Sequence, residues 1–231
     1  SYVADSLQLD ASDASGKSWT FQVLAEDNST TALDVTVNDT FVDLAGNIGT
    51  GDSVSLTVDT VNPTIVSFSH DNVDLVVSDN DATVTYTVEF SEVVQALDAT
   101  DLTIIGGTYV ADSLQLDASD ASGRTWTFEV EATDNSTTAL DVTLNNNIVD
   151  VNGNVLDLTG NSISLTVDTV NPTVTVAIVD GALSDGDSSS DVTFTFSEVI
   201  SGFEPGDITV VGGSLTDPVV DLGLDPSGLT W

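Results

Sequence analysis

Cysteine and methionine are absent from this sequence of 231 residues, histidine occurs once, and lysine and arginine together occur only twice. The missing cysteine excludes disulfides and thiolate metal sites within these residues, so an extracellular location would require another way to stabilise the domains. The scarcity of lysine and arginine excludes nucleic acid as a natural partner, because proteins bind phosphate backbones through those residues. No apolar run reaches the roughly 18 residues of a membrane-spanning helix, and we expect no membrane insertion.

Acidic residues dominate the charge, since 38 aspartates and glutamates give a formal net charge of −36. A charge of this size often accompanies disorder. The mean hydropathy of +0.17 and a clean alternation of apolar and polar residues instead favour folded β-structure. Because so many like charges repel one another in a compact state, we expect cations to act as the counterweight.

The sequence repeats with a period of about one small domain. Residues 2–16 recur unchanged as residues 109–123. The stretch Val-Asp-Thr-Val-Asn-Pro-Thr at 58–64 recurs unchanged at 167–173. Proline fixes its own φ angle and holds the preceding residue extended, so each copy of this stretch is predicted to be a short, stiff joint between two strands.

Division of the sequence at the two joints predicts three parts. The sequence is therefore expected to be an excerpt that starts out of phase with the repeat. The parts are the C-terminal half of one repeat (1–61), one complete repeat (62–170) and the N-terminal half of another (171–231).

Within the complete repeat, short segments rich in β-branched and aromatic residues alternate with turns of Asp, Asn and Gly. The pattern predicts an all-β fold, a sandwich of about seven antiparallel strands. The expected strands are 64–70, 82–90, 101–105, 108–117, 124–132, 138–145 and 162–168.

Aromatic residues and the histidine were considered as functional groups. Trp19, Trp126 and Trp231 could serve as sugar-stacking platforms, but their alternation with other apolar residues predicts core positions. His70 is expected in a turn without a second histidine nearby, so no Ser-His-Asp grouping can be built around it. We therefore expect no enzyme.

Acidic residues from several loops are predicted to meet at the poles of the sandwich, because consecutive antiparallel strands bring alternate loops to the same end. Oxygen ligands without nitrogen or sulfur select Ca²⁺ over zinc or copper. One set of positions recurs in phase at both joints and predicts a Ca²⁺ site at each. The ligands are Asp59, Glu92 and Asp101 at the first joint and Asp168, Glu198 and Asp207 at the second.

The loop before the last strand is a second candidate. Asp150, Asn152 and Asn154 offer oxygen ligands at i, i+2 and i+4, as at the start of a calcium-binding loop. The equivalent loop keeps Asp43 and Asn47 but has alanine between them. An Asx turn that ends in glycine is the alternative interpretation of both loops.

The order of these motifs resembles a known family. The repeat opens with Val-Asn-Pro-Thr, carries Phe-Ser-Glu at the end of its second strand and an Asp before its third, and has Asp-x-x-Gly-Asn before its last strand and Leu-Thr-Val-Asp-Thr at its exit. This is similar to the bacterial immunoglobulin-like tandem repeats that form the extender regions of giant RTX-type adhesins. The resemblance implies tandem immunoglobulin-like β-sandwiches in a secreted, extracellular cell-surface protein of biofilms, with neighbouring repeats of the same chain as partners and calcium rigidifying the joints.

The expected function is therefore that of a structural extender in a long bacterial surface adhesin. The alternative is an immunoglobulin-like module that binds carbohydrate, ice or a cell surface. Such a module would need an exposed aromatic row or a flat threonine array, for which Thr83, Thr85 and Thr87 are the nearest candidates. Lateral self-association through strand edges, or strand donation between half repeats, stays open.

Overall fold

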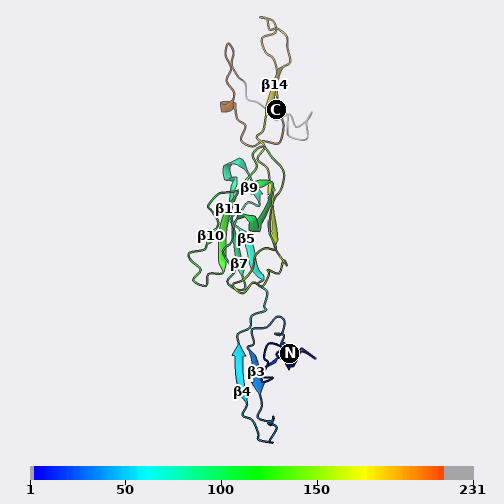
Figure 1. Cartoon of the computed structure of the whole chain (residues 1–231). Helices are drawn as coiled ribbons and strands as arrows, with labels where there is room; N and C mark the ends of the chain where they lie inside the picture. Colours follow the sequence, from blue (N-terminus) through cyan, green and yellow to red (C-terminus); the bar gives the residue numbers. More distant parts are fainter. Residues whose placement is uncertain (1–2, 216–231) are drawn as a thin grey trace. The chain divides into compact units, whose positions relative to one another are not determined.

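The computed structural model describes residues 3–215 (Figure 1), and the chain forms two compact units, 1–169 and 170–231. The described residues contain β-strands and three short 3₁₀ turns, which confirms the all-β prediction. The 3₁₀ turns are η1 (Asp79–Asp81), η2 (Ala99–Asp101) and η3 (Pro205–Asp207). The boundary between the two units falls in the second joint, while the division into three repeats stays a prediction.

Residues 62–169 form a sandwich of two sheets, drawn in cyan to yellow in Figure 1. The first sheet has the order β10 (Gln115–Leu116), β11 (Thr125–Ala132), β7 (Thr83–Phe90) and β5 (Ile65–His70), and β9 (Gly107–Tyr109) also pairs with β11. The second sheet has the order β6 (Val76–Val77), β13 (Ser162–Val167), β12 (Leu140–Leu144) and β8 (Leu102–Ile105). This arrangement is that of an immunoglobulin-like sandwich.

Three details differ from the expectation. The expected strand 108–117 is interrupted, because Asp112 adopts a left-handed conformation with φ of 63° between β9 and β10. The short strand β6 was not expected, and it pairs in parallel with β13, so the sandwich is not wholly antiparallel. His70 ends strand β5 instead of lying in a turn.

The core lies between the sheets and follows the two-residue period of the strands. On β7, Tyr86, Val88 and Phe90 are each 0% exposed, while the alternate residues face outward. On β11, Phe128 is likewise 0% exposed, and its ring stacks on Tyr86 with centroids 5.4 Å apart. Trp126 is 7% exposed, as predicted for a core residue.

Residues 3–57 form two small two-stranded sheets. One pairs β1 (Gln8–Leu9) with β2 (Trp19–Thr20), and the other pairs β3 (Leu33–Val37) with β4 (Asp52–Leu56). Trp19 is 59% exposed here, so its prediction as a core residue is wrong for this structure. Trp231 lies outside the described residues.

The second unit contains one hairpin within its described residues. Strand β14 (Val174–Ile178) pairs with β15 (Val192–Phe196), and the rings of Phe194 and Phe196 both pack on Phe203.

The first joint is held at both ends by hydrogen bonds of its threonines. The Thr60 hydroxyl donates to the Glu26 carbonyl at 2.7 Å and accepts from the Ser29 amide at 3.0 Å. The Thr64 amide donates to the Ser91 hydroxyl at 2.9 Å, and the Ser91 amide donates to the Thr64 carbonyl at 2.9 Å. Only three residues separate the two anchors, which limits the freedom of the joint.

The second joint repeats these contacts within each unit. In the first unit, the Thr169 hydroxyl donates to the Thr133 carbonyl at 2.7 Å and accepts from the Ser136 amide at 2.9 Å. In the second unit, the Thr173 amide donates to the Ser197 hydroxyl at 2.9 Å. The recurring threonines and the serine of Phe-Ser-Glu are therefore explained by the anchoring of strand ends.

Candidate metal centre

Three carboxylates from separate segments meet at one pole of the 62–169 sandwich. Asp59 comes from the joint, Glu92 follows β7, and Asp150 lies in the loop between β12 and β13. One oxygen of each lies within 4.8 Å of the others. Two oxygens bound to one Ca²⁺ at 2.3–2.6 Å can be at most about 5.2 Å apart, so this spacing permits a shared calcium ion.

Local hydrogen bonds bring the three segments together. The Pro63 carbonyl accepts from the Asp157 amide at 2.9 Å, which holds the joint against the loop that carries Asp150. The Ser91 carbonyl accepts from Nη1 of Arg124 at 3.1 Å, next to Glu92 in sequence. The backbone next to Asp59 and Glu92 is thus held by contacts with other segments of the sandwich.

Asp150 is fully buried in an Asx turn. Its Oδ1 accepts from the amides of Asn152 and Asn154 at 2.8 Å each, and its Oδ2 accepts from Nδ2 of Asn154 at 2.7 Å. Gly153 closes the turn with φ of 94°. Burial raises the pKa of Asp150, but the hydrogen bonds from Asn154, Asn152 and Gly153 outweigh it and leave the pKa below its ordinary value. The group therefore stays ionised at neutral pH.

The two asparagines of this loop donate hydrogen bonds toward the carboxylates. Nδ2 of Asn152 donates to Oδ2 of Asp59 at 2.7 Å, and Nδ2 of Asn154 donates to the Asp59 carbonyl at 3.2 Å. A metal-binding asparagine uses its amide oxygen. In this arrangement the side-chain nitrogens of Asn152 and Asn154 hold the acidic groups in place, and their role as metal ligands stays a prediction.

The surroundings of Glu92 disfavour its charged form. Its pKa is raised by burial first, and then by the negative charges of Asp150 and Asp59. Within residues 3–215, Arg124 forms an ion pair with Glu89 at 3.6 Å, so this cation neutralises a carboxylate other than Glu92. A divalent cation placed among the three oxygens would replace this mutual repulsion by attraction.

The raised pKa of Glu92 predicts how stability depends on pH when divalent cations have been removed. The folded state binds a proton at Glu92 more readily than the unfolded state does, so stability should rise as pH falls through the folded pKa of Glu92 and be lost again as pH rises through it. At still lower pH the trend should reverse, because the lowered pKa of Asp150 stabilises only the ionised form. Melting curves against pH measure this, and Glu92→Gln should flatten the rise. A melting temperature that falls steadily as the pH is lowered from neutral, with no initial rise, would contradict the assignment.

Asp101 is not a member of this group of three. It is 7% exposed, its Oδ2 accepts from the Asp98 amide at 2.8 Å, and its Oδ1 accepts from Nδ2 of Asn147. The side chain therefore caps the 3₁₀ turn η2 before strand β8. The sequence placed it at the correct pole, but the turn directs its carboxylate to Asp98 and Asn147 instead of toward the joint.

The predicted residues of the second joint belong to different units. Asp168 is exposed in the first unit, and its amide donates to the Val77 carbonyl at 2.9 Å. In the second unit, Oδ2 of Asp207 accepts from the Glu204 amide at 2.9 Å, which repeats the capping role of Asp101. Oε1 of Glu198 is buried. A shared site for Asp168, Glu198 and Asp207 stays a prediction.

The loop at Asp43 and Asn47 forms the same Asx turn as the loop at Asp150. Oδ1 of Asp43 accepts from the Asn47 amide at 2.8 Å, and Oδ2 accepts from Nδ2 of Asn47 at 2.8 Å. The hydrogen bond from the Asn47 side chain holds the pKa of Asp43 below its ordinary value. Both side chains are exposed, and the turn shows that this loop geometry arises from hydrogen bonds within the chain.

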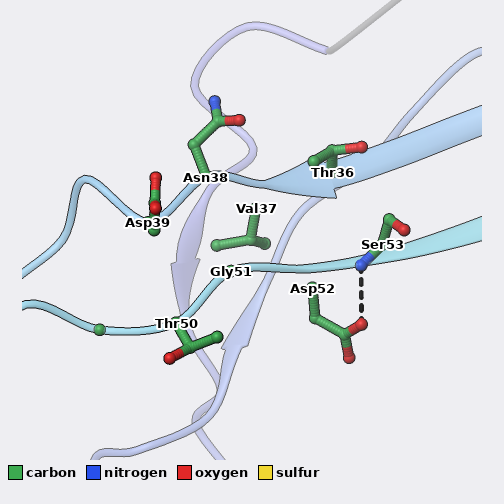
Figure 2. A pocket seen from close by; sticks show the side chains of 9 residues that line it. Thr36, Val37, Asn38, Asp39, Thr50, Gly51, Asp52 and Ser53 are labelled. Carbon is green, nitrogen blue, oxygen red and sulfur yellow. Dashed lines mark hydrogen bonds between the residues drawn. The ribbon is translucent and has the colours of Figure 1, made fainter.

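A shallow hollow of about 520 Å³ lies at the ends of β3 and β4 and was considered as a ligand site. Figure 2 shows the Val37 side chain in the middle of the residues that line it, with the Ser53 amide donating to Oδ1 of Asp52. Val37 is equivalent to Leu144, which is 0% exposed in the complete sandwich. The hollow is thus an uncovered core position, not a cavity shaped for a ligand.

Residues 168–224 match the model of the bacterial Ig-like domain family. Among solved structures, the chain is similar to the S-layer protein rSbsC(31-844), with 12% identity and a TM-score of 0.24, and to domains 1–6 of the surface layer protein SbsC, with 13% identity and a TM-score of 0.23. Each comparison covers 78% of this chain and 32% of the other, so this chain spans about a third of their length. The comparison with curated proteins gives no match. Within the part of the chain that the structure describes, no helix is long and apolar enough to cross a membrane.

Proposed function

We propose that this chain is an extender segment of a large, RTX-type bacterial surface adhesin, and that its joints are stiffened by Ca²⁺. The observation that carries the proposal is the group of Asp59, Glu92 and Asp150, in which a joint residue meets two loops of the following sandwich. A cation bound there ties the joint to that sandwich. The bacterial Ig-like match of residues 168–224 supports the same kind of module beyond the second joint.

The chemistry of the site suits calcium. All three groups offer hard carboxylate oxygens, which Ca²⁺ prefers, and no sulfur ligand exists in the sequence. Asp59, Glu92 and Asp150 would hold the ion, while Asn152 and Asn154 keep two of the carboxylates in place. Extracellular calcium-binding modules bind Ca²⁺ with Kd values of about 10⁻⁴ to 10⁻³ M.

The alternative function, a module that binds carbohydrate, ice or a cell surface, is less well supported by the outer face of β7. Thr85 lies opposite Glu129 and Thr83 lies opposite Glu131 in the register of β7 and β11. Glu89 follows on the same face of β7. The threonines are therefore interspersed with charged groups and do not form a flat uncharged array, which favours the structural role.

Small-angle X-ray scattering tests the proposal. With millimolar CaCl₂, the maximum dimension of the chain is expected to increase, because bound calcium restricts bending at the joints and removes charge repulsion within them. NaCl at the same ionic strength is the control, since salt alone screens charges without bridging carboxylates. Scattering curves that are the same with calcium and with a chelator would refute the calcium-stiffened extender.

A further inference from the structure

The loop between β12 and β13 carries an asparagine directly before a glycine. Asn152 precedes Gly153, and no other asparagine of this sequence is followed by glycine. This pair loses its side-chain amide more readily than other asparagine pairs, because glycine has no Cβ to shield its own backbone nitrogen. Asn154 lies in the same loop but precedes Val155, whose branched side chain crowds the backbone nitrogen. The loop therefore contains a reactive asparagine and, two residues later, an internal comparison.

The structure leaves the two reacting groups of this pair accessible. Asn152 is exposed. The Gly153 amide donates to the Asp150 carbonyl at 3.3 Å, which is longer than the ordinary range of about 2.7–3.2 Å, so this nitrogen is held only weakly. A Cβ placed on Gly153 would meet no atom within 4 Å, so other parts of the chain do not cover this side of the turn.

A carboxylate adjoins the nitrogen that would leave. Nδ2 of Asn152 donates to Oδ2 of Asp59 at 2.7 Å. When the amide nitrogen departs, it takes up a proton, and a neighbouring anion stabilises the positive charge that this creates. In Asn154 the corresponding nitrogen donates to Oδ2 of Asp150 at 2.7 Å, so what separates the two asparagines is the residue that follows each one.

We propose that Asn152 is a site of spontaneous deamidation, and that the product adds a fourth carboxylate to the candidate metal centre. The Gly153 nitrogen attacks Cγ of Asn152, and the new N–Cγ bond forms as the Cγ–Nδ2 bond breaks. Nδ2 leaves as ammonia with the proton of the Gly153 nitrogen. Water then opens the succinimide ring, giving aspartate if it adds at Cγ and isoaspartate if it adds at the main-chain carbonyl. The net reaction converts an amide and water into a carboxylic acid and ammonia.

The new carboxylate changes the balance of charge around Asp59. The hydrogen bond that Asn152 donates to Asp59 is replaced by repulsion between two carboxylates. Ca²⁺ accepts about six to eight oxygen ligands, so the three carboxylates of the candidate centre leave room for another. This step rests on the proposed function. The deamidated chain should be less stable than the original without calcium and should gain more stability when calcium is added.

Peptide mass spectrometry tests the modification itself. The full chain is incubated with a chelator in mildly alkaline buffer, because the Gly153 nitrogen must lose its proton, and samples are digested at intervals. The mass gain of replacing NH₂ by OH is expected to accumulate at Asn152, while Asn154 keeps its amide over the same time. Labelling by an isoaspartyl methyltransferase detects the isoaspartate product. An amide at Asn152 that lasts as long as that of Asn154 would overturn the proposal.

The variant Asn152→Asp tests the effect of the product on the centre. With a chelator its melting temperature should lie below that of the wild type, and the rise on adding CaCl₂ should be larger than in the wild type. Asn135→Asp is the matched control, because Asn135 is also exposed and its Nδ2 lies 3.4 Å from a carboxylate, that of Asp134, away from the three-carboxylate group. Equal calcium responses in the two variants would contradict a fourth ligand at position 152.

The two measurements separate this inference from the proposed function. If the wild type does not respond to calcium, the calcium-stiffened extender is refuted, whereas a mass gain at Asn152 still supports the modification. If the wild type responds to calcium but Asn152 keeps its amide, the modification is refuted and the extender function stands.

Discussion

In about 10 mM calcium, the melting temperature of the 62–169 sandwich is expected to rise by roughly 10–20 °C. A ligand at about 100 times its Kd adds about 2.7 kcal/mol of stability, and 1 kcal/mol shifts the melting temperature of a domain of this size by about 4–8 °C. Glu92→Gln should remove most of this rise, because it takes away the charge of one of the three proposed ligands. Thermal unfolding followed by circular dichroism or calorimetry measures the effect.

The same variant should have the opposite effect in the presence of a chelator. Without a cation, the charged form of Glu92 is disfavoured by burial and by the negative charges of Asp150 and Asp59, which together raise its pKa. Neutralising it should then raise the melting temperature slightly. Glu131→Gln, an exposed glutamate on the outer face of β11, is the control and should respond to calcium as the wild type does. If Glu92→Gln lowers the melting temperature equally with and without calcium, its role is structural and not that of a ligand.

The second large effect is expected in the core. Phe128→Ala should destabilise the complete sandwich by about 3–5 kcal/mol, because it removes a fully buried ring that stacks on Tyr86. Phe21→Ala makes the same change at the equivalent site and should cost less than about 1 kcal/mol in a monomer, since the side chain there is 41% exposed.

Urea unfolding measures the stability of both variants. The paired design keeps the residue type and its sequence neighbours nearly constant and changes only the covering of the site. Equal losses at the two sites would show that Phe21 is buried in solution, contrary to its exposure in this structure.

The strands of the sandwich were largely predictable because their signal is local. Alternating apolar residues place β7 at 83–90, one residue inside the expected range of 82–90. The errors arise where the signal is short or lies in the backbone. Strand β6 has only two residues, too few for a period to show. Asp112 divides an expected strand through a positive φ that its residue type permits but does not require.

The sequence predicted the pole at which the candidate site lies better than it predicted which residues belong to the site. Asp59, Glu92 and Asp150 were all expected at one pole, since antiparallel strands return their loops to the same end. Sequence reasoning put Asp150 in a separate loop site and Asp101 with the joint. The capping of η2 by Asp101 could have been suspected from the preceding Asp98, because an aspartate three residues before another acid at a turn is a capping pattern.

The sequence by itself determined the repeat, the joints, the all-β fold and the pole at which the acidic residues gather, because each depends on spacing along the chain. Only the tertiary structure decided which carboxylates share a site and which equivalent residues are buried. Those outcomes depend on what lies across the fold: Asp150 meets the joint because its loop packs against Pro63, and Phe128 is buried against Tyr86 whereas its equivalent Phe21 is 41% exposed.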